Sequence, residues 1–186
     1  MHLIKSTDGF RSRVANAGLR SEDLTLKMEG LRAVPLEEQR ELLRLEIAEV
    51  VRAYNTEEDK RRCIEQQAKS RGKTLRVRPQ LGLIYLEGTL PADGHVYVVI
   101  VVPPPLEALS DGAAVAGSAP SGGGQEIGDH RCYEVVIQKS AGEDRAVTLQ
   151  IGDILQLDED ERMKATGGGI ALIVLKYDVV QENYAH

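Results

Sequence analysis

Few residues of this chain have the types and spacing that catalysis or metal binding requires. His130 and Cys132 lie two positions apart, directly after Asp129, and could begin a metal site. Such a site needs three or four ligands that converge, and the remaining histidines are scattered along the chain. We therefore interpret His130 and Cys132 as a loop histidine beside a strand cysteine, and we expect no metal site.

Other patterns that could carry chemistry are incomplete. The acidic run 158–161 (Asp-Glu-Asp-Glu) lacks the ligand spacing and central glycine of a calcium loop, so it is interpreted as a solvated turn. No Gly-x-Ser-x-Gly nucleophile elbow is present. The glycine triplets at 122–124 and 167–169 lack the Lys-Ser/Thr and the strand-to-helix context of phosphate loops. We expect a protein that is not an enzyme and holds no cofactor, with an unrecognised active site as an alternative.

Basic residues are concentrated between Lys60 and Arg78, where they could contact phosphate groups. This segment has no interleaved aromatic residues on which bases could stack. The net charge of the whole chain is −6, which disfavours nucleic-acid binding. We interpret the basic segment as balancing an acidic helix before it, or an acidic face of a neighbouring subunit.

The composition indicates a cytoplasmic chain with an aliphatic core. Of its 186 residues 42% are hydrophobic, but it has one phenylalanine and no tryptophan, and its length allows one domain or two small ones. No apolar segment follows Met1 as a secretion signal would require. The apolar run 96–102 is too short to span a bilayer and predicts a strand buried on both faces. Cys63 and Cys132 are expected to be buried free thiols rather than a disulfide.

The region 1–74 is charged and favours helices. Thr7 or Asp8 can cap a short helix with Phe10, Val14 and Leu19 on one side. A second, amphipathic helix is predicted after Pro35, because apolar residues recur there at helical spacing. Its predicted buried stripe consists of Leu36, Leu43, Ile47, Val50 and Tyr54. Thr56 and Asp59 resemble a capping box that starts a further helix ending before Gly72.

The region 75–186 is rich in valine, isoleucine and glycine and favours strands. Residues 75–90 and 95–102 predict a hairpin around a Pro-Ala-Asp-Gly turn. Further strands are predicted at 133–138, 147–151, 154–157 and 170–175. Residues 107–129 hold almost no large apolar side chain and predict a Gly-rich mobile loop. Short strands with Gly-rich turns are typical of a small barrel or sandwich.

Four segments resemble, in their order and spacing, the GroES-type co-chaperonin (ten-kilodalton chaperonin) family. Residues 112–119 are similar to its mobile loop and residues 133–137 to the strand after that loop. Leu-Gln-Ile-Gly-Asp-Ile-Leu at 149–155 resembles the family's Gly-Asp signature, and 172–180 resembles its closing strand. The resemblance covers about residues 75–182. The family's first strand has two candidate counterparts, one in each arm of the predicted hairpin.

The resemblance implies a ring-forming β-barrel subunit that caps a chaperonin and assists protein folding. It implies that the chaperonin-binding residues are those of the mobile loop, namely Gly112, Ala113, Ala114, Val115, Ala116 and Gly117. Family members are about half this length, and the loop triplet that docks on the chaperonin is usually bulkier. Smaller side chains bury less area, which at roughly 25 cal/mol per Å² removes a few kcal/mol per loop.

We therefore predict an α+β protein with an N-terminal helical region (1–74) followed by a small GroES-like β-barrel (75–186). The first functional hypothesis is a divergent co-chaperonin, for example one encoded by a phage. The alternative is a non-enzymatic structural subunit of a larger assembly, such as a virion or shell, that uses the barrel for packing. Both hypotheses predict a homo-oligomer with protein partners and no membrane or nucleic-acid contact.

Overall fold

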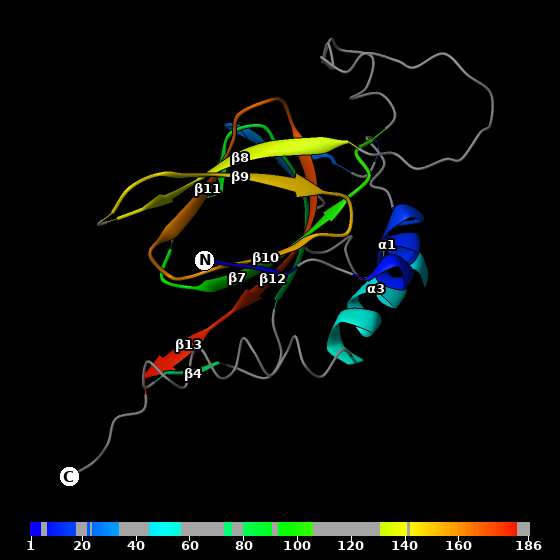
Figure 1. Cartoon of the computed structure of the whole chain (residues 1–186), viewed down its shortest axis with the longest axis horizontal. Coiled ribbons are helices and arrows are strands. Elements are labelled where there is room, and N and C mark those ends of the chain that lie inside the picture. Colours follow the sequence, from blue (N-terminus) through cyan, green and yellow to red (C-terminus); the bar gives the residue numbers. More distant parts are fainter. Residues whose placement is uncertain are drawn as a thin grey trace.

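Antiparallel strands make up most of the structure. The computed structural model describes residues 1–4, 7–17, 22, 24–33, 45–56, 73–75, 80–90, 93–105, 131–140 and 142–181. Within them a seven-stranded sheet lies between a pair of helices on one face and a four-stranded sheet on the other (Figure 1). The described part of the chain is thus a three-layer arrangement of helices, central sheet and outer sheet.

The seven-stranded sheet has the strand order β1-β10-β7-β12-β5-β3-β2. Its strands are β1 (His2–Ile4), β10 (Ile154–Leu157), β7 (Val96–Val102), β12 (Ile170–Tyr177), β5 (Gln80–Leu86), β3 (Leu31–Ala33) and β2 (Leu26–Met28). The four-stranded sheet consists of β6 (Thr89–Leu90), β11 (Glu161–Ala165), β8 (Cys132–Lys139) and β9 (Arg145–Gln150). A ribbon of β4 (Lys73–Leu75) and β13 (Val179–Gln181) extends away from both sheets (Figure 1).

Strand β7 is buried along its whole length, as its continuous apolar sequence predicts. Val98 and Ile100 belong to the core cluster under the helices, whereas Val99 and Val101 belong to the cluster between the two sheets. Alternate residues of a strand point to opposite faces, so a strand covered on both sides needs apolar residues at every position. The prediction for 96–102 is therefore confirmed.

Two helices cover the other face of the central sheet. Helix α1 (Asp8–Ala15) begins after Thr7, whose hydroxyl oxygen accepts a hydrogen bond from the Phe10 backbone N–H at 3.3 Å. Helix α3 (Leu45–Thr56) packs beside it and contributes Val50 and Tyr54 to the same cluster. The predicted cap and the buried positions Phe10, Val14, Val50 and Tyr54 are confirmed. The other predicted apolar positions, Leu19, Leu36, Leu43 and the side chain of Ile47, lie outside the described part of the chain. The predicted helix over 56–72 lies outside the described residues, apart from Thr56 itself, which ends α3.

The predicted fold class is wrong in two respects. Residues 1–74 do not form a helical region, because β1, β2 and β3 lie there and complete the seven-stranded sheet. The strands of the last two thirds of the chain form two stacked open sheets rather than a closed barrel. Strands of three residues are too short to show a period-two pattern, and short alternating strands look alike in a barrel and in a sandwich.

The predicted hairpin of residues 75–90 and 95–102 is also wrong. Strand β12 lies between β5 and β7 and pairs with both, in registers Ile173↔Leu83 and Ile173↔Ile100. Strands β5 and β7, which only the two-residue strand β6 separates in sequence, are thus not neighbours in the seven-stranded sheet. The inserted strand comes from the far end of the chain, and local turn chemistry gives no indication of such an insertion.

A pair of glycines fixes where the β2–β3 turn lies. The Gly30 carbonyl accepts hydrogen bonds from the backbone N–H groups of Glu87 (2.9 Å) and Gly88 (2.8 Å). Gly30 has φ = 68°, and a Cβ atom added to it would lie 2.9 Å from the Gly88 Cα. Only glycine fits this close approach without strain. The β2–β3 turn is therefore held against the β5–β6 turn, which sets the position of the sheet edge formed by β2.

Candidate functional site

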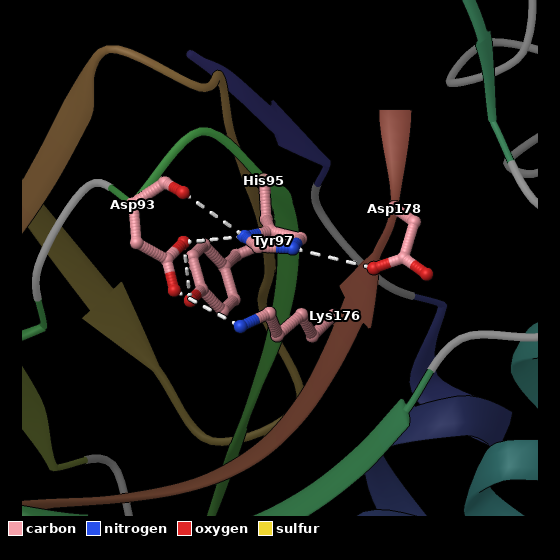
Figure 2. Close-up of polar contacts among 5 residues, drawn as sticks. All are labelled: Asp93, His95, Tyr97, Lys176 and Asp178. Carbon is pink, nitrogen blue, oxygen red and sulfur yellow. Dashed lines mark hydrogen bonds and ion pairs between the residues drawn. The ribbon is translucent and has the colours of Figure 1, made fainter. Parts of the chain in front are cut away.

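Two surface features of the described residues are candidates for function. The first is a polar cluster at the ends of β7 and β12, made of Asp93, His95, Tyr97, Lys176 and Asp178 (Figure 2). The second is the β2 edge, which we define as Leu26, Lys27, Met28 and Glu29.

Strand pairing builds the polar cluster. His95 and Tyr97 are two positions apart at the start of β7 and so share a face. Lys176 of β12 lies directly opposite Tyr97, and Asp178 follows at the end of the same strand. Asp93 reaches the group from the turn before β7, and Figure 2 shows the side chains of all these residues directed toward one another.

His95 lies between two carboxylates. Its Nδ1 is 2.8 Å from Oδ1 of Asp93 and 3.1 Å from the carbonyl oxygen of the same residue. Its Nε2 is 3.2 Å from Oδ1 of Asp178. Both ring nitrogens therefore face acceptors within the cluster, and a substrate or a metal ion would have to displace one of these contacts to reach the imidazole.

Asp93 is the centre of the cluster. Its Oδ1 accepts a hydrogen bond from the Tyr97 hydroxyl at 2.8 Å, and its Oδ2 lies 2.9 Å from Nζ of Lys176. Partial burial acts to raise the pKa of Asp93. The hydrogen bonds from Lys176, Tyr97 and His95, together with the charge of Lys176, outweigh burial and lower that pKa from 3.8 to about 2.

The same contacts act on Tyr97. Burial is the largest cause that raises the pKa of its phenol, and the hydrogen bond to Asp93 and the charge of that carboxylate add to it. Tyr97 is thus held as a neutral hydroxyl donor, and Lys176 also lies over its ring, 5.9 Å from the ring centroid. The cluster ties the turn before β7 to the end of β12 through charges that satisfy one another. This arrangement suits a structural link better than acid–base catalysis.

The β2 edge exposes apolar side chains at the margin of the seven-stranded sheet. Leu26 is 46% exposed and Met28 is 61% exposed, and they are the exposed large hydrophobic residues among those described. They pair with Ala33 and Leu31 of β3, which contact the core between the two sheets. Opposite residues of paired strands lie on the same face, so Leu26 and Met28 continue that core beyond its covered part.

Most of the candidate site residues predicted from the sequence lie outside the described part of the chain. The predicted chaperonin-binding residues Gly112, Ala113, Ala114, Val115, Ala116 and Gly117 lie outside the described residues, as do Asp129, His130, Cys63 and most of the basic segment. Cys132 is a free thiol, as predicted, but it is exposed, so the prediction that it is buried is wrong. In the part of the chain that the structure describes, no three or more His, Cys, Asp or Glu residues are grouped as a metal ion would require.

The acidic run at 158–161 forms a turn, as predicted, but its two end residues are buried rather than solvated. Asp158 and Glu161 are each only 5% exposed. The α-amino group of Met1 lies 3.1 Å from Oδ2 of Asp158 and 2.6 Å from Oε2 of Glu161, and the Asp158 backbone N–H donates to the same Oε2 at 2.9 Å. Strand β11 begins at Glu161, and charged residues at alternate positions conceal it from a search for apolar runs.

Sequence reasoning missed both candidate sites. The i, i+2 pairs His95/Tyr97 and Lys176/Asp178 are a detectable signal only once the pairing of β7 with β12 is known. The alternation of Leu26 and Met28 with Lys27 was hidden in a region assigned to helices. Predicting either site would have required knowing which strands, distant in the chain, are neighbours in the sheet.

Comparison with protein-family models, with curated proteins and with solved structures finds no match to this chain. None of the described helices is long and apolar enough to cross a membrane.

Proposed function

We propose that this chain is a non-enzymatic subunit of a protein assembly and that the β2 edge is one of its contact surfaces. The observation that carries the proposal is the exposure of Leu26 and Met28 on the terminal strand of the seven-stranded sheet. A terminal strand offers unpaired backbone N–H and C=O groups to a partner strand. Apolar side chains beside those groups add affinity when the partner covers them.

The size of the effect follows from the exposed fractions. Fully burying a leucine or methionine side chain contributes about 1.5–3 kcal/mol. About half of the surface of each residue is exposed, at 46% for Leu26 and 61% for Met28. Covering both would therefore contribute about 2 kcal/mol per chain. One such contact is weak, and repeated contacts in a ring or shell would strengthen it through avidity.

The structural-subunit hypothesis fits this surface better than the chaperonin-lid hypothesis. The lid hypothesis depended on a closed barrel, and the described strands form two stacked sheets instead. Its docking residues at 112–117 lie outside the described residues. A cytoplasmic location, which the acidic composition favours, belongs to the same proposal.

Light scattering over a concentration series tests this function. The wild-type chain is expected to gain mass as its concentration rises, and Met28→Lys is expected to gain less, because a charge cannot be buried at the contact. Thr148→Lys is the matched control, since Thr148 is exposed on β9 of the other sheet. Equal association of Met28→Lys and the wild-type chain would contradict the proposal.

A further inference from the structure

We propose that the partner of the β2 edge is a second copy of this chain, paired antiparallel around a two-fold axis at Met28. In this register Met28 lies opposite Met28 of the other copy, and Lys27 lies opposite Glu29. The inference rests on the proposed function, because it names the occupant of the same surface. It joins two seven-stranded sheets into one continuous sheet.

The β2–β3 hairpin determines which backbone groups face outward. Met28 and Leu31 flank a two-residue turn and lie opposite each other. Residues that flank such a turn exchange hydrogen bonds, and the hydrogen-bonding direction alternates along the strand. The N–H and C=O of Lys27 therefore point away from β3. An antiparallel partner must place opposite Lys27 either Thr25 or Lys27, or else Glu29, the first residue of the turn, whose N–H points outward because the Met28 carbonyl of the same peptide unit points toward β3.

Charge selects one of these three registers. Lys27 opposite Lys27 places like charges together, which is destabilising, and Thr25 provides no charge. Glu29 opposite Lys27 provides an opposite charge, and the two-fold axis forms this pair twice. Lys27 and Glu29 are both exposed, and within the described part of the chain neither has an ion-pair partner. Both are thus available for a cross-copy pair.

The same register covers the most exposed apolar side chain. Met28 of each copy occupies a non-hydrogen-bonded position, where opposing Cα atoms are only about 4.5 Å apart and side chains are closest. At 61% exposure Met28 has the most surface to lose. Gly30, with φ = 68°, ends the extended segment soon after. The paired segment is short, so we expect a weak, concentration-dependent dimer.

A charge-reversal cycle tests this register. Sedimentation velocity is measured for the wild-type chain, Lys27→Glu, Glu29→Lys and the double variant that carries both changes. Each single reversal places like charges together twice and is expected to weaken association about tenfold, whereas the double variant is expected to return to within about threefold of the wild-type value. Urea unfolding of each variant verifies that the fold is kept.

The outcomes separate this inference from the proposed function. If Met28→Lys weakens association but the single reversals do not, the edge is a contact surface and the self-pairing register is wrong. If the double variant is folded but fails to recover, the register is also wrong. A wild-type chain that stays monomeric at every concentration overturns the self-pairing and the homo-oligomeric form of the proposed function together.

Discussion

Asp93→Asn tests the polar cluster through its dependence on pH. Asn keeps the shape of the side chain but removes the charge that Lys176 and His95 contact at 2.9 and 2.8 Å. The folded pKa of Asp93 is lowered from 3.8 to about 2. Its charge therefore stabilises the fold fully above pH 3.8, and this contribution is lost as the pH falls through about 2.

The magnitude follows from the same shift. Lowering the pKa from 3.8 to about 2 corresponds to roughly 2 kcal/mol if none of it is screened. The Asp93 side chain is 39% exposed, so solvent screens its contacts considerably. We therefore expect Asp93→Asn to lower the free energy of unfolding by about 1 kcal/mol at pH 7. Most of this difference from the wild-type chain should be gone at pH 2.

Urea unfolding at pH 7, pH 4 and the lowest pH at which both proteins stay folded provides the measurement. Asp160→Asn is the matched control, because Asp160 forms an exposed ion pair with Lys139 at 3.7 Å, outside the cluster. The reasoning is refuted if Asp93→Asn costs the same at every pH. It is also refuted if Asp160→Asn reproduces the whole effect.

Two further predictions concern the core. Asp153 is fully buried, its Oδ2 accepts the Gln150 backbone N–H at 3.0 Å, and its Oδ1 lies 3.4 Å from a guanidinium nitrogen of Arg11. Asp153→Ala should lower the free energy of unfolding by about 3 kcal/mol, and Asp153→Asn should lower it clearly less. Equal losses for the two variants in urea unfolding would contradict this prediction. A Cβ atom at position 169 would overlap the Tyr85 ring. Gly169→Ala should therefore lower the free energy of unfolding by about 1–3 kcal/mol. If the clash is the cause, thermal unfolding should show a smaller loss of stability when Gly169→Ala is made in a Tyr85→Leu background.

Local signals in the sequence predicted the elements that local physics determines. The Thr7 cap, the buried positions Phe10, Val14, Val50 and Tyr54, and the fully buried strand at 96–102 are all indicated by neighbouring residues alone. The strands at 133–138 and 154–157 were predicted for the same reason. These predictions required no knowledge of which elements pack together.

The pairing of strands that are distant in the chain could not be predicted from the sequence. The three-residue strands β1 to β3 acquire their structure from β10 and β5, and they have almost no pattern of their own. Asp158 and Glu161 looked solvated because their buried partner, the α-amino group of Met1, is at the opposite end of the chain. Both candidate sites depend on contacts of this kind, which is why neither was predicted.

Disulfide trapping at the β2 edge tests the central claim most directly. Met28→Cys is made with Cys63 and Cys132 replaced by serine, and the chain is oxidised at a concentration where it associates. The account predicts a covalent dimer that forms much faster than with Thr148→Cys in the same background, because the two-fold axis places the two residues 28 side by side. No dimer, or a dimer that forms no faster than the control, would contradict it.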